Sequence, residues 1–210
     1  MRSIYIGLLF SALLTAPAQA ERTFFIAPMA GYNFGGSLDV TEHPEGQERQ
    51  KVGELKVEDA ESFGLMFGVE TQDPGNIYLY YSRQRSAFKE GDFGSPTGLD
   101  LDVDYYHIGG SLWFPRGRFE PYVTSSVGVT RLLPDGGVSS ETRFSLGLGV
   151  GARYRLLEHL SIFADVRSFF IFMENSTSLV CPGEDGTCRF RIEGNAMIQG
   201  QATLGLMVRF

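Results

Sequence analysis

His159 and Ser161 form the one pair in this chain whose types and spacing suggest nucleophilic chemistry. They flank Leu160, and Glu174 follows as a candidate acid. A histidine that takes the proton of a serine hydroxyl, oriented in turn by a carboxylate, would catalyse ester hydrolysis or another acyl transfer. The three side chains must come within hydrogen-bond distance for this to work, so the hypothesis depends on the elements that position them.

The other candidate ligands do not form a metal or cofactor motif. The chain has three histidines and two cysteines, without a Cys-x-x-Cys pair. His43 lies in an acidic segment, and His107 lies in a strand-like stretch without a paired acid. Transition-metal sites need several such ligands at close spacing. We therefore expect no catalytic metal and no cofactor.

Two groups of carboxylates stand out. Asp100, Asp102 and Asp104 alternate along a predicted strand, and Arg83 and Arg85 on the preceding strand are their expected cross-strand partners. The segment 35–61 contains a longer acidic series, made of Asp39, Glu42, Glu45, Glu48, Glu54, Glu58, Asp59 and Glu61. Such carboxylates can bind divalent cations, but this composition is more typical of a charged, solvated loop, which is the favoured interpretation.

The N-terminus predicts export. Residues 1–20 combine Arg2, an apolar run over 4–16 and the sequence Pro-Ala-Gln-Ala, which is typical of a cleaved signal peptide. An uncleaved anchor is the alternative, but the run is shorter than the roughly 20 apolar residues of a spanning helix. We expect a mature domain over 21–210. Export also predicts a disulfide between Cys181 and Cys188 that stiffens the last long loop.

Alternation of apolar and polar residues dominates the mature chain. From 196 to 210 the even positions are apolar or small, whereas the odd positions are mostly polar or small. Residues 143–154 and 160–172 repeat this pattern, and each stretch is long enough to cross a bilayer as a tilted strand. Less regular stretches complete a set of eight strands, at 23–34, 62–70, 76–87, 99–114 and 119–132. The apolar phase changes near Tyr105 and Tyr106, which predicts a β-bulge.

The connections alternate between short and long. Short turns are expected at 72–75, 115–118 and 155–159, and long loops at 35–61, 88–98, 133–140 and 173–193. Aromatic residues gather beside the short turns, as in an interfacial girdle. The fold class is therefore all-β, an eight-stranded antiparallel up-and-down transmembrane β-barrel. A secreted β-sandwich shares the alternation, but it does not explain the loop order.

The end of the chain carries a family resemblance. Leu204, Leu206, Val208 and the terminal Phe210 resemble the assembly signal of outer-membrane barrels, and the segments 119–128 and 158–167 resemble their strands. The chain is similar to the outer-membrane β-barrel domain family, to which small OmpA-, OmpX- and OmpW-like barrels belong. The resemblance implies a location in the outer membrane of a Gram-negative cell and assembly by the barrel assembly machinery. It implies no reaction.

An eight-stranded barrel has an interior just wide enough for side chains, so a filled lumen is expected. The predicted occupants form a polar network of mixed sign, which could pair as a structural plug or form a narrow conducting path, the plug being favoured. These residues are Glu120, Arg143, Arg153, Asp165, Arg167 and Arg209, with Tyr122, Gln199 and Gln201 beside them. Glycines 147, 149 and 151 on the same face would leave room for the long arginines.

The function expected is non-enzymatic, serving envelope integrity or surface interaction through the outer loops, with passage of small or apolar molecules as the alternative. The pair His159 and Ser161 is similar to the His-x-Ser of the barrel family that removes acyl chains from lipid A. The topology separates His159 from Glu174 by a whole strand, tens of ångströms, which argues against an enzyme. The expected partners are membrane lipid and lipopolysaccharide. We expect a monomer, and the net charge of −7 argues against nucleic acid.

Overall fold

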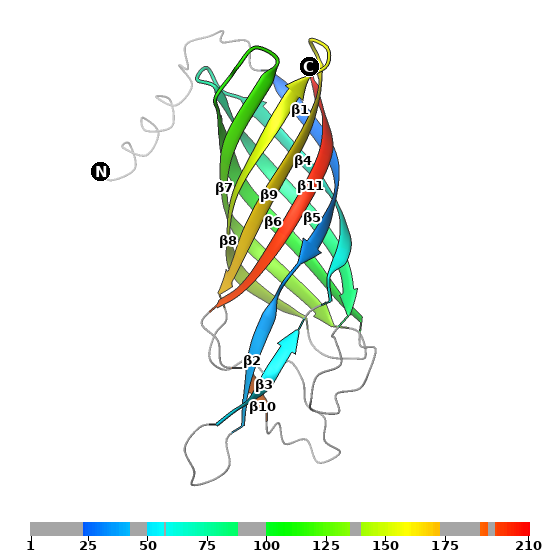
Figure 1. Ribbon diagram of the computed structural model, residues 1–210, viewed down its shortest axis with the longest axis vertical. Coiled ribbons are helices and arrows are strands. Elements are labelled where there is room, and N and C mark those ends of the chain that lie inside the picture. The colour runs from blue at the N-terminus through cyan, green and yellow to red at the C-terminus, as the bar shows by residue number, and fades with distance from the viewer. Residues whose placement is uncertain are drawn as a thin grey trace, which may run out of the picture.

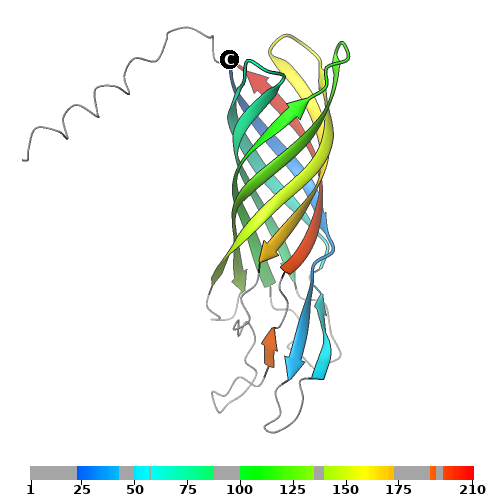
Figure 2. The same cartoon turned by 90° about the vertical axis from the view of Figure 1, so that its left-hand side faces the viewer.

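Eight long strands form a closed antiparallel barrel (Figures 1 and 2). The computed structural model describes residues 23–42, 50–56, 58–87, 100–134, 140–172, 190–192 and 196–210. The barrel order is β1-β11-β9-β8-β7-β6-β5-β4, which confirms the predicted up-and-down topology. The strands are β1 (Phe24–Phe34), β4 (Ala60–Glu70), β5 (Gly75–Ala87), β6 (Asp100–Trp113), β7 (Phe119–Pro134), β8 (Glu141–Arg155), β9 (Leu160–Phe172) and β11 (Ala196–Arg209). No helix in the described residues is long and apolar enough to cross a membrane.

The barrel closes where the first strand pairs with the last. Phe24 and Phe210 exchange two backbone hydrogen bonds of 2.9 Å, and their rings stack with centroids 6.4 Å apart. The pairing then continues along β1 and β11 as far as Phe34 opposite Gly200. The contact between Phe24 and Phe210 lies at the end of the barrel where tight turns join β4 to β5, β6 to β7 and β8 to β9, and we call this end the short-turn end. The opposite end is the loop end.

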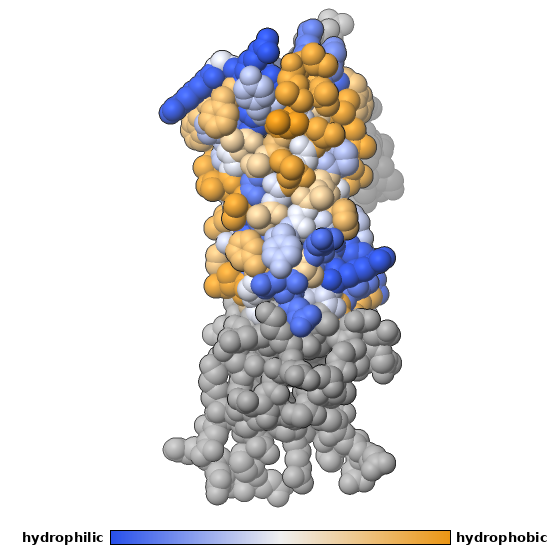
Figure 3. Space-filling view, turned by 45° about the vertical axis from the view of Figure 1, so that its right-hand side comes forward, coloured by the Kyte–Doolittle hydropathy of each residue, from blue (hydrophilic) through white to orange (hydrophobic). Residues whose placement is uncertain are grey.

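The barrel has an apolar outer wall and a largely polar interior. On β11, Leu204, Leu206 and Val208 are exposed on the wall, whereas Gln199 and Gln201 are fully buried inside. The other strands alternate in the same way, so apolar side chains cover much of the wall, and Figure 3 shows one face of it. A water-soluble barrel would bury its apolar face, so this arrangement is that of a membrane-spanning barrel.

The predicted β-bulge in β6 is wrong. The strand pairs with β5 and β7 in unbroken register from Leu101 to Leu112. Leu101, Val103 and Tyr105 point into the interior, where they are buried, and the residues between them face outward. Between Tyr106 and the short-turn end most of the apolar residues of β6 face outward, whereas between Tyr106 and the loop end they face inward. The apolar side therefore changes because the outer wall becomes charged beyond Tyr106, and not because the backbone shifts.

A small second sheet lies beyond the loop end (Figures 1 and 2). The strand β2 (Ser37–Glu42) pairs with β3 (Gln50–Lys56), and β10 (Phe190–Ile192) pairs with the other edge of β2. The prediction that 35–61 forms only a loop is therefore wrong, since part of this segment is a hairpin. The sheet joins two connections that are far apart in the sequence.

Several predicted features fall outside the described residues. They are the signal peptide at 1–20, the disulfide between Cys181 and Cys188, the candidate acid Glu174, His43 and the loop at 88–98. These remain predictions from the sequence.

Candidate functional site

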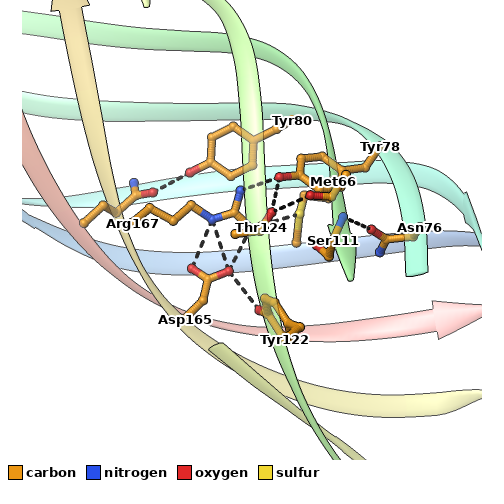
Figure 4. Close-up of polar contacts among 11 residues, drawn as sticks. Met66, Asn76, Tyr78, Tyr80, Ser111, Tyr122, Thr124, Asp165 and Arg167 are labelled. Carbon is orange, nitrogen blue, oxygen red and sulfur yellow. Dashed lines mark hydrogen bonds and ion pairs between the residues drawn. The ribbon is translucent and has the colours of Figure 1, made fainter. Parts of the chain in front are cut away.

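Arg167 crosses the middle of the lumen (Figure 4). Together with Asp165, Tyr122, Tyr78 and Thr124 it forms the most connected polar layer of the interior, which we call the central layer. The Arg167 guanidinium donates to both carboxylate oxygens of Asp165, two residues earlier on β9, with distances from 2.8 to 3.2 Å. Tyr122 of β7 donates to the same carboxylate at 2.9 Å. Both charged side chains are almost fully buried. Because an isolated buried charge is very costly, their pairing is what allows both to stay inside the barrel.

The donor directions in this layer follow from its chemistry. Arg167 has no acceptor, so its Nη1 donates to the Tyr78 hydroxyl at 3.1 Å. Tyr78 then donates to the Thr124 hydroxyl at 2.5 Å, and Thr124 donates to the carbonyl of Gly110 at 3.1 Å. The guanidinium also lies over the rings of Tyr78 and Tyr80, 5.4 and 4.8 Å from their centroids. One arginine thus links β9 to strands on the far side of the barrel.

Glycines on the inner face of β8 make room for this layer, as predicted. A Cβ at Gly149 would lie 2.8 Å from Cγ of Arg167, and one at Gly151 would lie 2.6 Å from Cζ of Tyr122. Real side chains do not approach so closely. The missing side chains on β8 are therefore part of the packing of the central layer.

A second ionic layer lies near the short-turn end. Arg153 donates to Glu120 at 2.6 Å and to Glu70 at 2.7 Å, and its guanidinium lies 3.7 Å from the ring centroid of Trp113. Arg155 contacts Glu120 at 3.1 Å, and Arg209 contacts Glu70 at 3.5 Å. Glu70 and Arg155 were not among the predicted lumen residues. Each has the inward phase of its strand, and that phase was the available signal.

The six predicted lumen residues therefore lie in three places. Glu120, Arg153 and Arg209 belong to the layer at the short-turn end, whereas Asp165 and Arg167 form the central layer. Arg143 lies near the loop end, where its Nη2 donates to Glu141 at 2.8 Å. The inward phase of these six residues predicted a single network, whereas the structure divides them among three places.

An uncharged amide layer comes next toward the loop end. The amide nitrogen of Gln201 lies 2.8 Å from the Asn33 oxygen and 3.0 Å from the hydroxyls of Ser62 and Ser82. Asn33 in turn donates to Gln84 at 2.8 Å, and Tyr80 donates to the Gln201 oxygen. Asn33 and Gln84 were not among the predicted lumen residues, because uncharged polar residues on a strand carry no distinctive signal.

The outer part of the lumen is less polar. His107 lies between the hydroxyls of Ser126 and Ser145, at 3.0 and 2.9 Å from its two ring nitrogens. Beside it, the Tyr105 ring stacks on Phe169 with centroids 4.2 Å apart. Further buried apolar residues at this level are Leu101, Val103, Leu132, Ile171 and Met197. His107 is thus a packed, hydrogen-bonded residue among hydroxyls and aromatic rings.

Little space remains between the central layer and the ionic layer at the short-turn end. A cavity between the central layer and the ionic layer around Arg153 has a volume of only about 10 Å³. Its lining includes Met66, Trp113, Arg153 and Arg167. This volume is about the room of a single water molecule. The central layer and the layer at the short-turn end therefore leave almost no free volume between them.

The candidate hydrolytic pair does not form a site. His159 is exposed in the turn between β8 and β9, whereas Ser161 is fully buried inside the barrel. The Ser161 hydroxyl has no hydrogen-bond partner among the described residues, which include His159. In the part of the chain that the structure describes, no group of three or more His, Cys, Asp or Glu residues is placed to hold a metal ion.

An apolar wall, a polar filled interior and a closed ring of eight strands define an integral membrane β-barrel. Residues 6–210 match the family described as outer membrane protein beta-barrel domain, and the chain belongs to this family. The protein is therefore located in the outer membrane. No curated protein matches the chain.

Solved structures share this fold at low sequence identity. Outer membrane protein OprG from Pseudomonas aeruginosa is 14% identical with a TM-score of 0.64, over 90% of this chain and 96% of that one. Neisserial surface protein A is 16% identical with a TM-score of 0.60, over 89% and 97% of the two chains. Outer membrane protein AlkL, solved in lipid bilayers, is 17% identical with a TM-score of 0.53, over 93% and 95%. These likenesses support the fold alone.

Proposed function

We propose that this protein is a closed, non-enzymatic barrel that serves envelope integrity or surface interaction by holding its outer connections at the cell surface. The observation that carries this proposal is the Arg167 layer, which crosses the lumen and is hydrogen-bonded on several strands. In barrels of this class short turns face the periplasm and long connections face outward. We infer that the sheet of β2, β3 and β10 lies on the outside.

The energetics of the lumen support a closed barrel. A continuous path would require Arg167 to leave Asp165, and separating a buried pair costs several kcal/mol. The ionic layer around Arg153 and the amide layer around Gln201 would both have to open as well. These layers lie in series along the lumen, so opening one of them alone gives no passage.

Conductance across a planar lipid bilayer tests the closed lumen. The mature protein is first shown to be folded by a heat-dependent shift of its mobility in SDS. We expect no steady current after it inserts, whereas a large porin in the same bilayer serves as the positive control. A steady open-channel current from the heat-shifting protein would refute the closed lumen.

Replacement of the outer sheet tests the surface role. Substituting residues 37–56 by a short Gly-Ser linker removes β2 and β3 and leaves every barrel strand in place. We expect the variant to keep its heat-dependent mobility and to lose either surface binding or the resistance of cells to detergent. A variant that behaves like the wild type in both assays would remove the proposed role of this sheet.

The wall of the terminal strand supports the proposed route of assembly. Leu204, Leu206, Val208 and Phe210 are all exposed on the outer wall of β11. A row of this kind is accessible to the barrel assembly machinery before the seam closes. We propose that these side chains are the assembly signal and that the protein functions as a monomer.

A second candidate function is uptake of small apolar molecules. The apolar layer around Phe169 and Ile171 favours it, because the loop end of the lumen could solvate an apolar guest better than the polar layers below. Uptake of an apolar fluorescent probe into liposomes that contain the protein tests this candidate. A rate equal to that of empty liposomes would eliminate it.

The non-enzymatic part of the proposal has its own test. The separation of the exposed His159 from the buried Ser161 supports the absence of a lipid A esterase. We expect the mass spectrum of lipid A to be unchanged in cells that overproduce the protein. Loss of an acyl chain would show that the protein is an enzyme.

A further inference from the structure

The outer wall near the loop end carries a charged row directly beside an aromatic one. Across β4 to β7, Phe63, Arg83, Asp104 and Arg131 lie opposite one another in register, and we call them the arginine row. One step toward the short-turn end, the adjacent row contains Tyr81 and Tyr106, whose ring centroids are 5.1 Å apart. Tyrosines between apolar and charged surfaces are typical of the membrane boundary. The arginine row therefore lies at the level of the lipid headgroups.

An apolar groove follows the aromatic row on its membrane side. It has a volume of about 470 Å³ and runs over the outer face of β4 to β7. Its lining side chains on the wall include Leu79, Tyr81, Tyr106, Ile108, Val127 and Val129. The groove starts at the tyrosine pair and continues toward the middle of the wall. An acyl chain whose headgroup lies on the arginine row would therefore enter this groove.

The charges of the arginine row favour an anion at one depth. Arg83 donates to both oxygens of Asp104, at 2.6 and 2.7 Å, and the carboxylate is only 1% exposed, so its charge is neutralised. Arg131 flanks Asp104 on the other side, is exposed, and forms no ion pair in the described part of the chain. The row thus has two cations and one anion.

The next row outward has the opposite balance. Arg85 lies opposite Asp102, and the exposed Glu61 is on the neighbouring strand β4. That row has two anions and one cation. An anionic headgroup is therefore favoured beside the tyrosines and disfavoured one step further from the membrane, which sets the depth at which a phosphate can bind.

We propose that this surface binds a phosphorylated lipid of the outer leaflet. Its phosphate contacts Arg83 and Arg131, and one acyl chain lies in the groove over β4 to β7. Lipid A is the lipid of this chemistry in the outer leaflet. The proposal rests on the orientation of the barrel and not on the closed lumen, so current through the lumen would leave it unchanged.

Lipid titration of the folded, full-length mature protein in neutral detergent tests the site. The probes are bisphosphorylated lipid A, phosphatidylcholine and inorganic phosphate, with bound lipid counted by native mass spectrometry. Arg131→Gln removes an exposed cation that forms no ion pair among the described residues, and we expect it to weaken lipid A binding about 5-fold, as for one arginine near a charged surface. Arg85→Gln is the matched control, one row further out, and should change binding less than 2-fold.

A second pair of variants tests the groove. Val127→Trp fills the groove, whereas Val166→Trp makes the same change on the wall of β9, away from the groove. We expect only Val127→Trp to weaken lipid A binding, and the heat-dependent mobility shift checks that both variants fold. Equal losses in Arg131→Gln and Arg85→Gln would show nonspecific charge attraction and overturn the proposal. Competition by inorganic phosphate at lipid concentrations would show a simple anion site and would overturn it too.

Discussion

Replacement of Arg167 by methionine should be among the most damaging single changes in the lumen. The substitution keeps the apolar stem but removes the guanidinium that neutralises Asp165. The Asp165 side chain is fully buried, and among the described residues only the Tyr122 hydroxyl, at 2.9 Å, would still donate to it. Breaking a buried pair by removing one partner costs about 3–5 kcal/mol. We expect a loss of this size in the free energy of unfolding.

A second substitution, at Asp165, should recover most of the lost stability. Asp165→Asn removes the orphaned charge and keeps an oxygen that can accept from Tyr122. Replacing both charges of a buried pair by neutral groups is often close to neutral. We therefore expect the double variant Asp165→Asn/Arg167→Met to be more stable than Arg167→Met alone. Arg153→Met should cost less, because Glu120 retains Arg155 at 3.1 Å and Glu70 retains Arg209 at 3.5 Å.

Urea unfolding in lipid vesicles measures these effects. The chain has a single tryptophan, Trp113, whose fluorescence reports on the interior of the barrel. The wild type, the single variants Asp165→Asn and Arg167→Met, and the double variant form a double-mutant cycle. The cycle separates the interaction energy between Asp165 and Arg167 from the effect of each substitution alone. A loss below about 1 kcal/mol for Arg167→Met would refute the reasoning. A double variant as unstable as the single one would refute it as well.

Three further substitutions test the outer wall, the packing beside the β8 glycines and the hydrogen bond from Arg167 to Tyr78. Leu204→Arg places a charge on the lipid side of β11 and should cost about 2–4 kcal/mol in vesicle unfolding, so a neutral result would contradict the membrane position of this strand. Gly151→Val would crowd the Tyr122 ring and should cost about 1–3 kcal/mol by urea titration, and full stability would show that the layer can shift. Tyr78→Phe removes the acceptor of Arg167 Nη1 and should cost about 1–3 kcal/mol in the same assay, where no loss would argue against the assigned donor direction.

Alternation predicted the eight barrel strands because the two faces of the wall meet different surroundings. The rule failed in β6 for the same physical reason. Beyond Tyr106 the outer face carries Asp102 and Asp104, whereas Val103 packs inside the loop end of the barrel. The side that is apolar thus reverses beyond the membrane boundary, and Tyr106 indicates that boundary only once its outward orientation is known.

The contacts of the lumen could be predicted only in part. Charged residues with an inward phase were identifiable, but the partner of each one depends on its height in the barrel. Gln201 reaches Asn33, which is 168 positions away, and Arg153 reaches Glu70, which is 83 positions away. Such distances follow from register and tilt, which alternation alone does not give. The sheet of β2, β3 and β10 was missed because its strands have only three to seven residues, too few for alternation to be distinctive.

The seam between β1 and β11 also determines the order in which the barrel can form. Every other pair of neighbouring barrel strands is consecutive along the chain among the barrel strands. In contrast, Phe24 and Phe210 come from opposite ends of the described chain. Such a long-range contact forms late and slowly. Until it forms, β1 and β11 each leave one edge with unpaired backbone groups, which attract other chains. The slow step of folding should therefore be ring closure, and the species most prone to aggregate should be the open, nearly complete sheet.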